Sequence, residues 1–171
     1  MASAPPIRTD GLAVARGIDT APLDGAVGFW LRLGQQQDLR RFNRTFTHEG
    51  ASQLVYSLLL LIEANPRCRQ ADLGAALHIR QPNLVEPIEG LIARGSVQRR
   101  PDPEDRRAQT LELTAEGETL LARLRAAHDA LIEGYRERLG SEDYERLVGL
   151  LRRFVAVDER TPAPLRSTSQ R

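Results

Sequence analysis

Arginine supplies most of the side chains in this sequence that could recognise another molecule. All 24 basic residues are arginine, and several lie in the stretches RCR (67–69) and VQRRPDPEDRRA (97–108). A guanidinium group is flat, stays charged and donates two parallel hydrogen bonds, so every basic contact can be bidentate. The net charge is only +1, so the distribution of the arginines must decide which partner they suit.

No pattern of residues in the sequence fits catalysis or metal binding. It contains no glycine-rich phosphate loop, no nucleophile motif and no arrangement of paired carboxylates. His48, His78 and His128 are too scattered to form a zinc site, and no second cysteine supports one. We therefore expect no catalytic residue, no metal and no cofactor, and a protein that is not an enzyme.

The composition predicts a mainly α-helical protein in the cytoplasm. Aromatic residues make up 5% of the chain, and no long stretch alternates apolar and polar residues as strands do. Cys68 is the only cysteine, which excludes an internal disulfide and suits a reducing compartment. The longest apolar stretch, residues 58–62, is too short to span a bilayer, and the first residues lack the apolar core of a signal peptide. We expect no membrane partner.

Apolar spacing and turn signals predict six helices and one hairpin. Thr114 and Ser141 are the expected N-caps of the last two helices, Gly95 is the expected left-handed end of the fourth, and Pro87 is expected to kink that helix. The helices are predicted over 23–46, 51–64, 70–78, from Pro82 to Gly95, over 114–139 and from Ser141 onward, with strands at 97–100 and 109–114.

The central helices and the hairpin have the plan of a winged helix–turn–helix. The outer helices carry more apolar surface than this small lobe can cover, so a second copy of the chain is expected to cover the rest as a homodimer.

The stretch 65–117 resembles the MarR family of transcription regulators. The most specific part is the hairpin, called the wing. Its motif is a basic pair, then Asp-x-Arg, then Leu-x-Leu-Thr with a glycine three residues after the threonine. The matching residues are Arg99, Arg100, Asp105, Arg107, Leu111, Leu113, Thr114 and Gly117. With outer helices of matching length and pattern, the resemblance covers about residues 23–157. It implies a ligand-responsive repressor that binds palindromic operator sites in double-stranded DNA as a homodimer, associated with the nucleoid.

Composition predicts the two terminal segments, which show no apolar periodicity, and the order of the predicted elements gives the segments between them. We expect a flexible arm over 1–22, a dimerisation helix over 23–50, a DNA-binding lobe over 51–113, dimerisation helices over 114–158 and a flexible tail over 159–171.

The resemblance implies that Arg107 contacts the minor groove and that Asp105 orients the Arg107 side chain. An arginine at a hairpin tip can enter the narrow minor groove, where negative potential is concentrated. A carboxylate two residues earlier can fix its guanidinium group through a bidentate pair.

The fourth helix is expected to be the recognition helix. Gln81 and Asn83 can each read adenine in the major groove, and Arg80 can contact guanine or a phosphate. Glu86 departs from the arginine or threonine often found there in the family; it can accept from cytosine, but it also repels phosphates. Phosphate contacts, which set register and give salt dependence, are expected from Arg67, Arg69, Arg94, Arg99 and Arg100.

The family also implies a pocket for a small effector between the dimer helices and the DNA-binding lobe. An arginine beside aromatic side chains suits an aromatic carboxylate or its coenzyme A thioester. The candidate ligand-binding residues are Trp30, Arg40, Arg41, His48 and Tyr56, each of which could equally be a core or surface residue.

Two alternatives remain open at this stage. Cys68 lies between Arg67 and Arg69, which could lower its thiol pKa and make it a redox sensor, although the peroxide-sensing branch of the family keeps its cysteine in the first helix. The chain could also be a helical protein-interaction module with a degenerate winged helix, which would have no need of Asp105 and Arg107.

Overall fold

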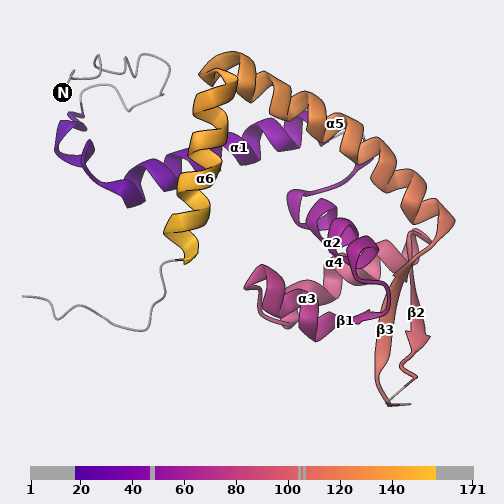
Figure 1. Ribbon diagram of the computed structural model, residues 1–171. Coiled ribbons are helices and arrows are strands. Elements are labelled where there is room, and N and C mark those ends of the chain that lie inside the picture. Colours follow the sequence, from indigo (N-terminus) through magenta and orange to yellow (C-terminus); the bar gives the residue numbers. More distant parts are fainter. Residues whose placement is uncertain (1–17, 47–48, 104, 106, 157–171) are drawn as a thin grey trace, which may run out of the picture. The chain divides into compact units, whose positions relative to one another are not determined.

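A computed structural model describes residues 18–46, 49–103, 105 and 107–156 (Figure 1). The chain divides into two compact units, Met1–Arg41 and Phe42–Arg171, each of which is treated by itself. Helices dominate the described residues, and three short strands form one sheet. This confirms the predicted fold class.

The elements follow the predicted order with small differences at their ends. The first predicted helix begins later than expected, because Ala21–Leu23 form a separate 3₁₀ turn and Gly25 follows it. The helices are α1 (Val27–Phe46), α2 (Gln53–Ala64), α3 (Gln70–Leu77), α4 (Pro82–Ala93), α5 (Ala115–Leu139) and α6 (Ser141–Ala156).

Several predicted caps are confirmed in the structure. Pro82 occupies the first turn of α4, which continues through Pro87, and Gly95 follows that helix with φ of 70°. The Thr114 side chain accepts a hydrogen bond from the Gly117 N–H at 3.1 Å and caps α5. Ser141 is the first residue of α6 and not its cap, because Gly140 with φ of 82° makes the break before it.

The sheet contains one strand that the sequence did not predict. Strands β2 (Val97–Pro101) and β3 (Gln109–Leu113) form the expected antiparallel hairpin, and β1 (Cys68–Arg69) pairs with the other edge of β3. In Figure 1 the hairpin projects from the group formed by α2, α3 and α4. The two-residue strand β1 therefore ties the start of α3 to the wing.

The second unit has an apolar core drawn from α2, α4 and α5. Its fully buried side chains include Leu58, Leu59 and Ile62 of α2, Leu84, Ile88 and Leu91 of α4, and Leu121 and Leu124 of α5. This core fixes which face of α4 points outward. None of the described helices is both long and apolar enough to cross a bilayer.

Candidate nucleic-acid interface

A tight turn between α3 and α4 sets the start of the predicted recognition helix. His78 ends α3 in the left-handed conformation with φ of 52°, and the Ile79 N–H donates to the Gly74 carbonyl at 2.9 Å. A Cβ atom on Gly74 would lie 2.9 Å from the Gln81 amide nitrogen and 3.0 Å from the Ile79 carbonyl oxygen. The close approach explains why glycine occupies this position.

The turn also engages one of the predicted base-reading residues. The Gln81 side-chain amide donates to the Gln70 carbonyl at 3.3 Å, across the turn from the first residue of α3. Gln81 therefore helps hold the turn together, and reading a base would require that weak contact to break.

Three predicted DNA-contacting residues lie exposed at α4, Arg80 in the turn before the helix and Asn83 and Glu86 along it. Within the described part of the chain, no hydrogen bond or ion pair holds the side chains of Arg80, Asn83 and Glu86. Leu84, Ile88 and Leu91 face the core, so the helix presents Asn83 and Glu86 outward. Donors and acceptors that are not satisfied within the protein are available to base edges and phosphates.

The first strand of the wing is joined to α4 by a charged pair. Arg99 donates through both terminal nitrogens to the two carboxylate oxygens of Glu89, and the pKa of the Glu89 carboxyl is lowered chiefly by these hydrogen bonds. Both groups are exposed, so the pair adds little to stability, but it couples the wing to the recognition helix. Arg100 makes a longer ion pair with Glu112 of β3 at 3.5 Å.

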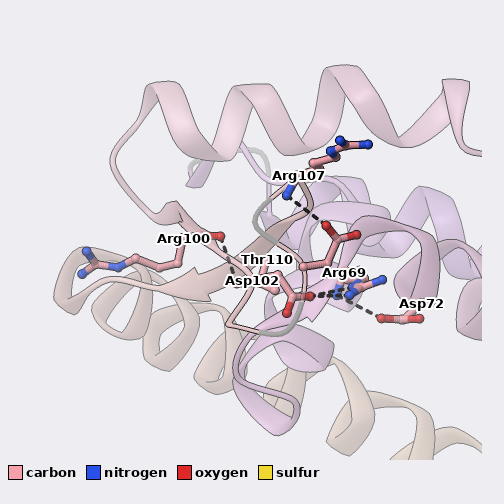
Figure 2. Close-up of polar contacts among 7 residues, drawn as sticks. Arg69, Asp72, Arg100, Asp102, Arg107 and Thr110 are labelled. Atoms are coloured by element: carbon pink, nitrogen blue, oxygen red, sulfur yellow. Dashed lines mark hydrogen bonds and ion pairs between the residues drawn. The ribbon is translucent and has the colours of Figure 1, made fainter.

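The wing is braced by a second pair just beyond the end of β2, toward its tip, shown in Figure 2. The Asp102 carboxylate is nearly buried and accepts from Arg69 Nε at 2.7 Å and from its terminal nitrogen at 2.6 Å. The hydrogen bonds to Asp102 raise the pKa of Arg69. The Arg69 main-chain N–H also donates to the Asp72 carboxylate at 3.0 Å at the start of α3. Arg69, expected to contact phosphate, is thus engaged in holding the wing to α3.

The sequence-based expectation for the wing tip needs one correction. The Asp105 carboxylate accepts from the main-chain N–H of Arg107 at 3.0 Å and not from its guanidinium group. Figure 2 shows the Arg107 side chain extending away from that contact. An aspartate two residues before the donor forms a turn with the main chain, so Asp105 shapes the tip while the guanidinium group stays exposed.

Arg94 and Arg67 are the two remaining residues that were predicted to contact phosphate. Arg94 donates to the Gly50 carbonyl at 3.0 Å and so ties the end of α4 to the segment before α2. Arg67 is exposed in the turn before β1 with φ of 64°, and its main-chain N–H donates to the Leu111 carbonyl.

The candidate effector-binding residues belong to different units. Trp30 and Arg40 are exposed and Arg41 is half-buried in the first unit, where the Trp30 indole N–H donates to the Asp24 carbonyl at 2.8 Å. Tyr56 of the second unit is 6% exposed and packs against Phe42, Phe46 and His128, with ring centroids 5.0 to 6.1 Å away. His48 lies outside the described residues.

The pKa of the Cys68 thiol is not lowered, contrary to what its arginine neighbours suggested. The thiol is half-buried in β1, and burial is the main cause that raises its pKa. The expected lowering of the pKa by Arg67 and Arg69 is wrong, because desolvation is the largest cause of the shift and the charge of Asp72 also raises the pKa. A raised pKa disfavours the reactive thiolate.

The recognition-helix turn, the exposed polar face of α4 and the braced hairpin define a DNA-binding winged helix–turn–helix regulator of transcription. Residues 50–108 match the model of the MarR family. A transcriptional regulatory protein for the hcr operon of Thauera aromatica is 34% identical over 143 residues, which span 83% of this chain and 86% of that protein. The chain belongs to the MarR family, whose matched members regulate transcription.

Solved structures agree with this assignment. The repressor CouR bound to a 23-mer DNA duplex superposes with a TM-score of 0.74 at 28% identity, covering 81% of this chain and 98% of CouR. CouR has also been solved with p-coumaroyl-CoA, with a TM-score of 0.72 at 25% identity over 82% of this chain and 99% of CouR. BpsR of Bordetella bronchiseptica, whose DNA binding is regulated by 6-hydroxynicotinic acid, superposes with a TM-score of 0.73 at 25% identity. The match covers 78% of this chain and 96% of BpsR.

Proposed function

We propose that this regulator is a cytoplasmic repressor that binds palindromic operator DNA as a homodimer and is released by a small aromatic acid or its coenzyme A thioester. The observation that carries the DNA-binding part is a set of side chains with no partner in the described chain: Arg80 just before α4, Asn83 and Glu86 on α4, and Arg107 on the wing. Apart from Arg67, whose side chain is also exposed, the other predicted contact residues make side-chain contacts that shape the lobe.

In this proposal α4 enters the major groove and Arg107 enters the adjacent minor groove. The Glu89–Arg99 and Asp102–Arg69 pairs keep the wing in a fixed orientation to α4 and α3, so that both grooves are contacted together. The similarity in fold to CouR, which has been solved bound to a DNA duplex, supports this arrangement.

The homodimer is supported by the apolar surface of the outer helices. Helix α6 has no buried residue, yet it carries Leu147, Leu150, Leu151 and Phe154 at helical spacing, all exposed in the single chain. Apolar patches of this kind mark protein interfaces. We infer that residues 23–50 and 114–158 form the dimerisation helices and residues 51–113 the DNA-binding lobe.

The effector class rests on the relatives, because CouR binds p-coumaroyl-CoA and BpsR responds to 6-hydroxynicotinic acid. Trp30, Arg40, Arg41, His48 and Tyr56 are the sequence-based candidates for contacting this effector.

The test measures mass, DNA binding and release on the full chain. Light scattering should give twice the 19.1 kDa of one chain, and fluorescence anisotropy should show tight, salt-sensitive binding to duplex from the promoters beside the gene. Aromatic acids and their thioesters should raise the melting temperature and lower DNA affinity. A monomer, or binding that does not change between 50 and 200 mM salt, would refute the proposal.

A further inference from the structure

We propose that Glu86 determines operator specificity by selecting a cytosine in each half-site. The inference rests on the proposed function, because it assigns one side chain of α4 to one kind of base. It concerns sequence preference and not overall affinity.

The first observation is where Glu86 lies on the helix. Successive helical residues are about 100° apart, so Glu86 lies roughly 170° around the axis from the stripe formed by Leu84, Ile88 and Leu91. That stripe is fully buried, whereas Glu86 is exposed. Glu86 therefore occupies the middle of the outward face, the part of a recognition helix that goes deepest into the major groove.

The second observation is that Glu86 has no counter-charge in the described chain. Glu89, one turn further on, is neutralised by Arg99 through two hydrogen bonds, which lower the pKa of its carboxyl. Among the described residues, no arginine forms a corresponding ion pair with Glu86. When α4 meets DNA, Glu86 brings an uncompensated carboxylate close to phosphates, and this contact is unfavourable unless the DNA supplies a hydrogen-bond donor.

The major groove supplies few such donors. Guanine presents two acceptors and thymine one acceptor and a methyl group, so neither satisfies a carboxylate. Cytosine presents its N4 amino group, which a carboxylate accepts directly. Adenine presents an amino group beside the acceptor N7, which repels the second carboxylate oxygen. Glu86 thus favours cytosine and acts against the other bases, since discrimination can come from penalising wrong partners.

The neighbouring residue offers the complementary readout. Asn83, three residues earlier on α4, is also exposed and has a side chain that pairs bidentately with adenine. A glutamine at position 86 would have the same donor and acceptor pair as Asn83. Glu86→Gln should therefore change the preferred base at its position from cytosine to adenine, while keeping the size of the side chain.

The experiment selects bound duplexes from a randomised library, sequences them, and compares the full-length protein with Glu86→Gln and Glu86→Ala. Glu137→Gln on α5 is the matched control, because it removes the same charge from an exposed glutamate elsewhere. The parent and the control should share one strongly preferred cytosine per half-site. Replacing that cytosine should weaken parent binding roughly 5- to 150-fold per half-site, as for a good base contact.

The variants distinguish the possible outcomes. Adenine preference in Glu86→Gln and loss of preference at that single position in Glu86→Ala would support the inference. An unchanged preference at every position in both variants would overturn it while leaving the proposed function intact. If no protein in the set selects any duplex sequence, both the proposed function and this inference fail.

Discussion

Gly117 gives the sharpest test of how the lobe is packed. It lies in the first turn of α5, and a Cβ atom built there would lie 2.0 Å from the Ser96 carbonyl oxygen and 2.9 Å from its carbonyl carbon. The Ser96 carbonyl accepts from the Thr114 N–H at 3.2 Å, and the Ser96 N–H donates to the Leu91 carbonyl at 2.9 Å. The obstructing atoms are therefore main chain held from both sides, and they cannot move away easily.

Gly117→Ala should consequently destabilise the protein although alanine favours helix. Overpacking costs about 1–3 kcal/mol, and a contact this short belongs at the upper end of that range. The better helix propensity of alanine offsets roughly 1 kcal/mol, which leaves a net loss of about 2 kcal/mol. For a chain of this size the melting temperature should fall by about 4–8 °C.

Gly134→Ala is the matched control, because it makes the same substitution in the same helix. No atom lies within 4 Å of a Cβ built on Gly134, so only the propensity gain remains and the protein should be stabilised by about 0.5–1 kcal/mol. Calorimetry of both variants at equal protein concentration measures the difference. A Gly117→Ala variant that melts at or above the parent temperature would refute the packing argument.

Three further predictions concern DNA contact by the wing, the loss of stability at acidic pH and the reactivity of the Cys68 thiol. Arg107→Ala should reduce the free energy of operator binding by about 1–3 kcal/mol in anisotropy titrations without lowering the melting temperature; equal affinity would contradict a groove contact. Arg125 lowers the pKa of Glu63 below its ordinary value of 4.5, so the pair stabilises the fold above about pH 4.5 and this contribution is lost as pH falls. Glu63→Gln should therefore flatten the pH dependence of the melting temperature on the acid side, and an unchanged profile would count against the pair. Because burial raises the pKa of Cys68, iodoacetamide should alkylate the native protein several-fold more slowly than the urea-unfolded chain at pH 7; equal rates would show an exposed thiol.

Local signals in the sequence were sufficient for most of the secondary structure. Pro82, Gly95 and Thr114 mark helix ends through conformational limits and hydrogen bonds that involve only near neighbours, so their positions could be predicted without the fold. Apolar spacing on α4 likewise fixed its buried face. Strand β1 was missed because two residues carry no periodic signal, and it forms only where β3 lies beside it.

The assignment of individual arginines depended on tertiary contacts. Arg69 and Arg99 were each predicted to contact phosphate, because no neighbouring residue in the sequence indicates the carboxylate with which each forms an ion pair. Asp102 lies 33 residues after Arg69, and Glu89 faces Arg99 only once the wing has folded beside α4.

The sequence alone determined the winged-helix plan, the family and the polar face of α4, because each follows from residue types at short fixed spacings. Tertiary structure alone decided which charges are neutralised inside the protein and which remain available to DNA, and it placed Tyr56 in the aromatic core. The reason is physical: periodicity and capping are local, whereas an ion pair or a buried ring depends on which distant segments the folded core brings together.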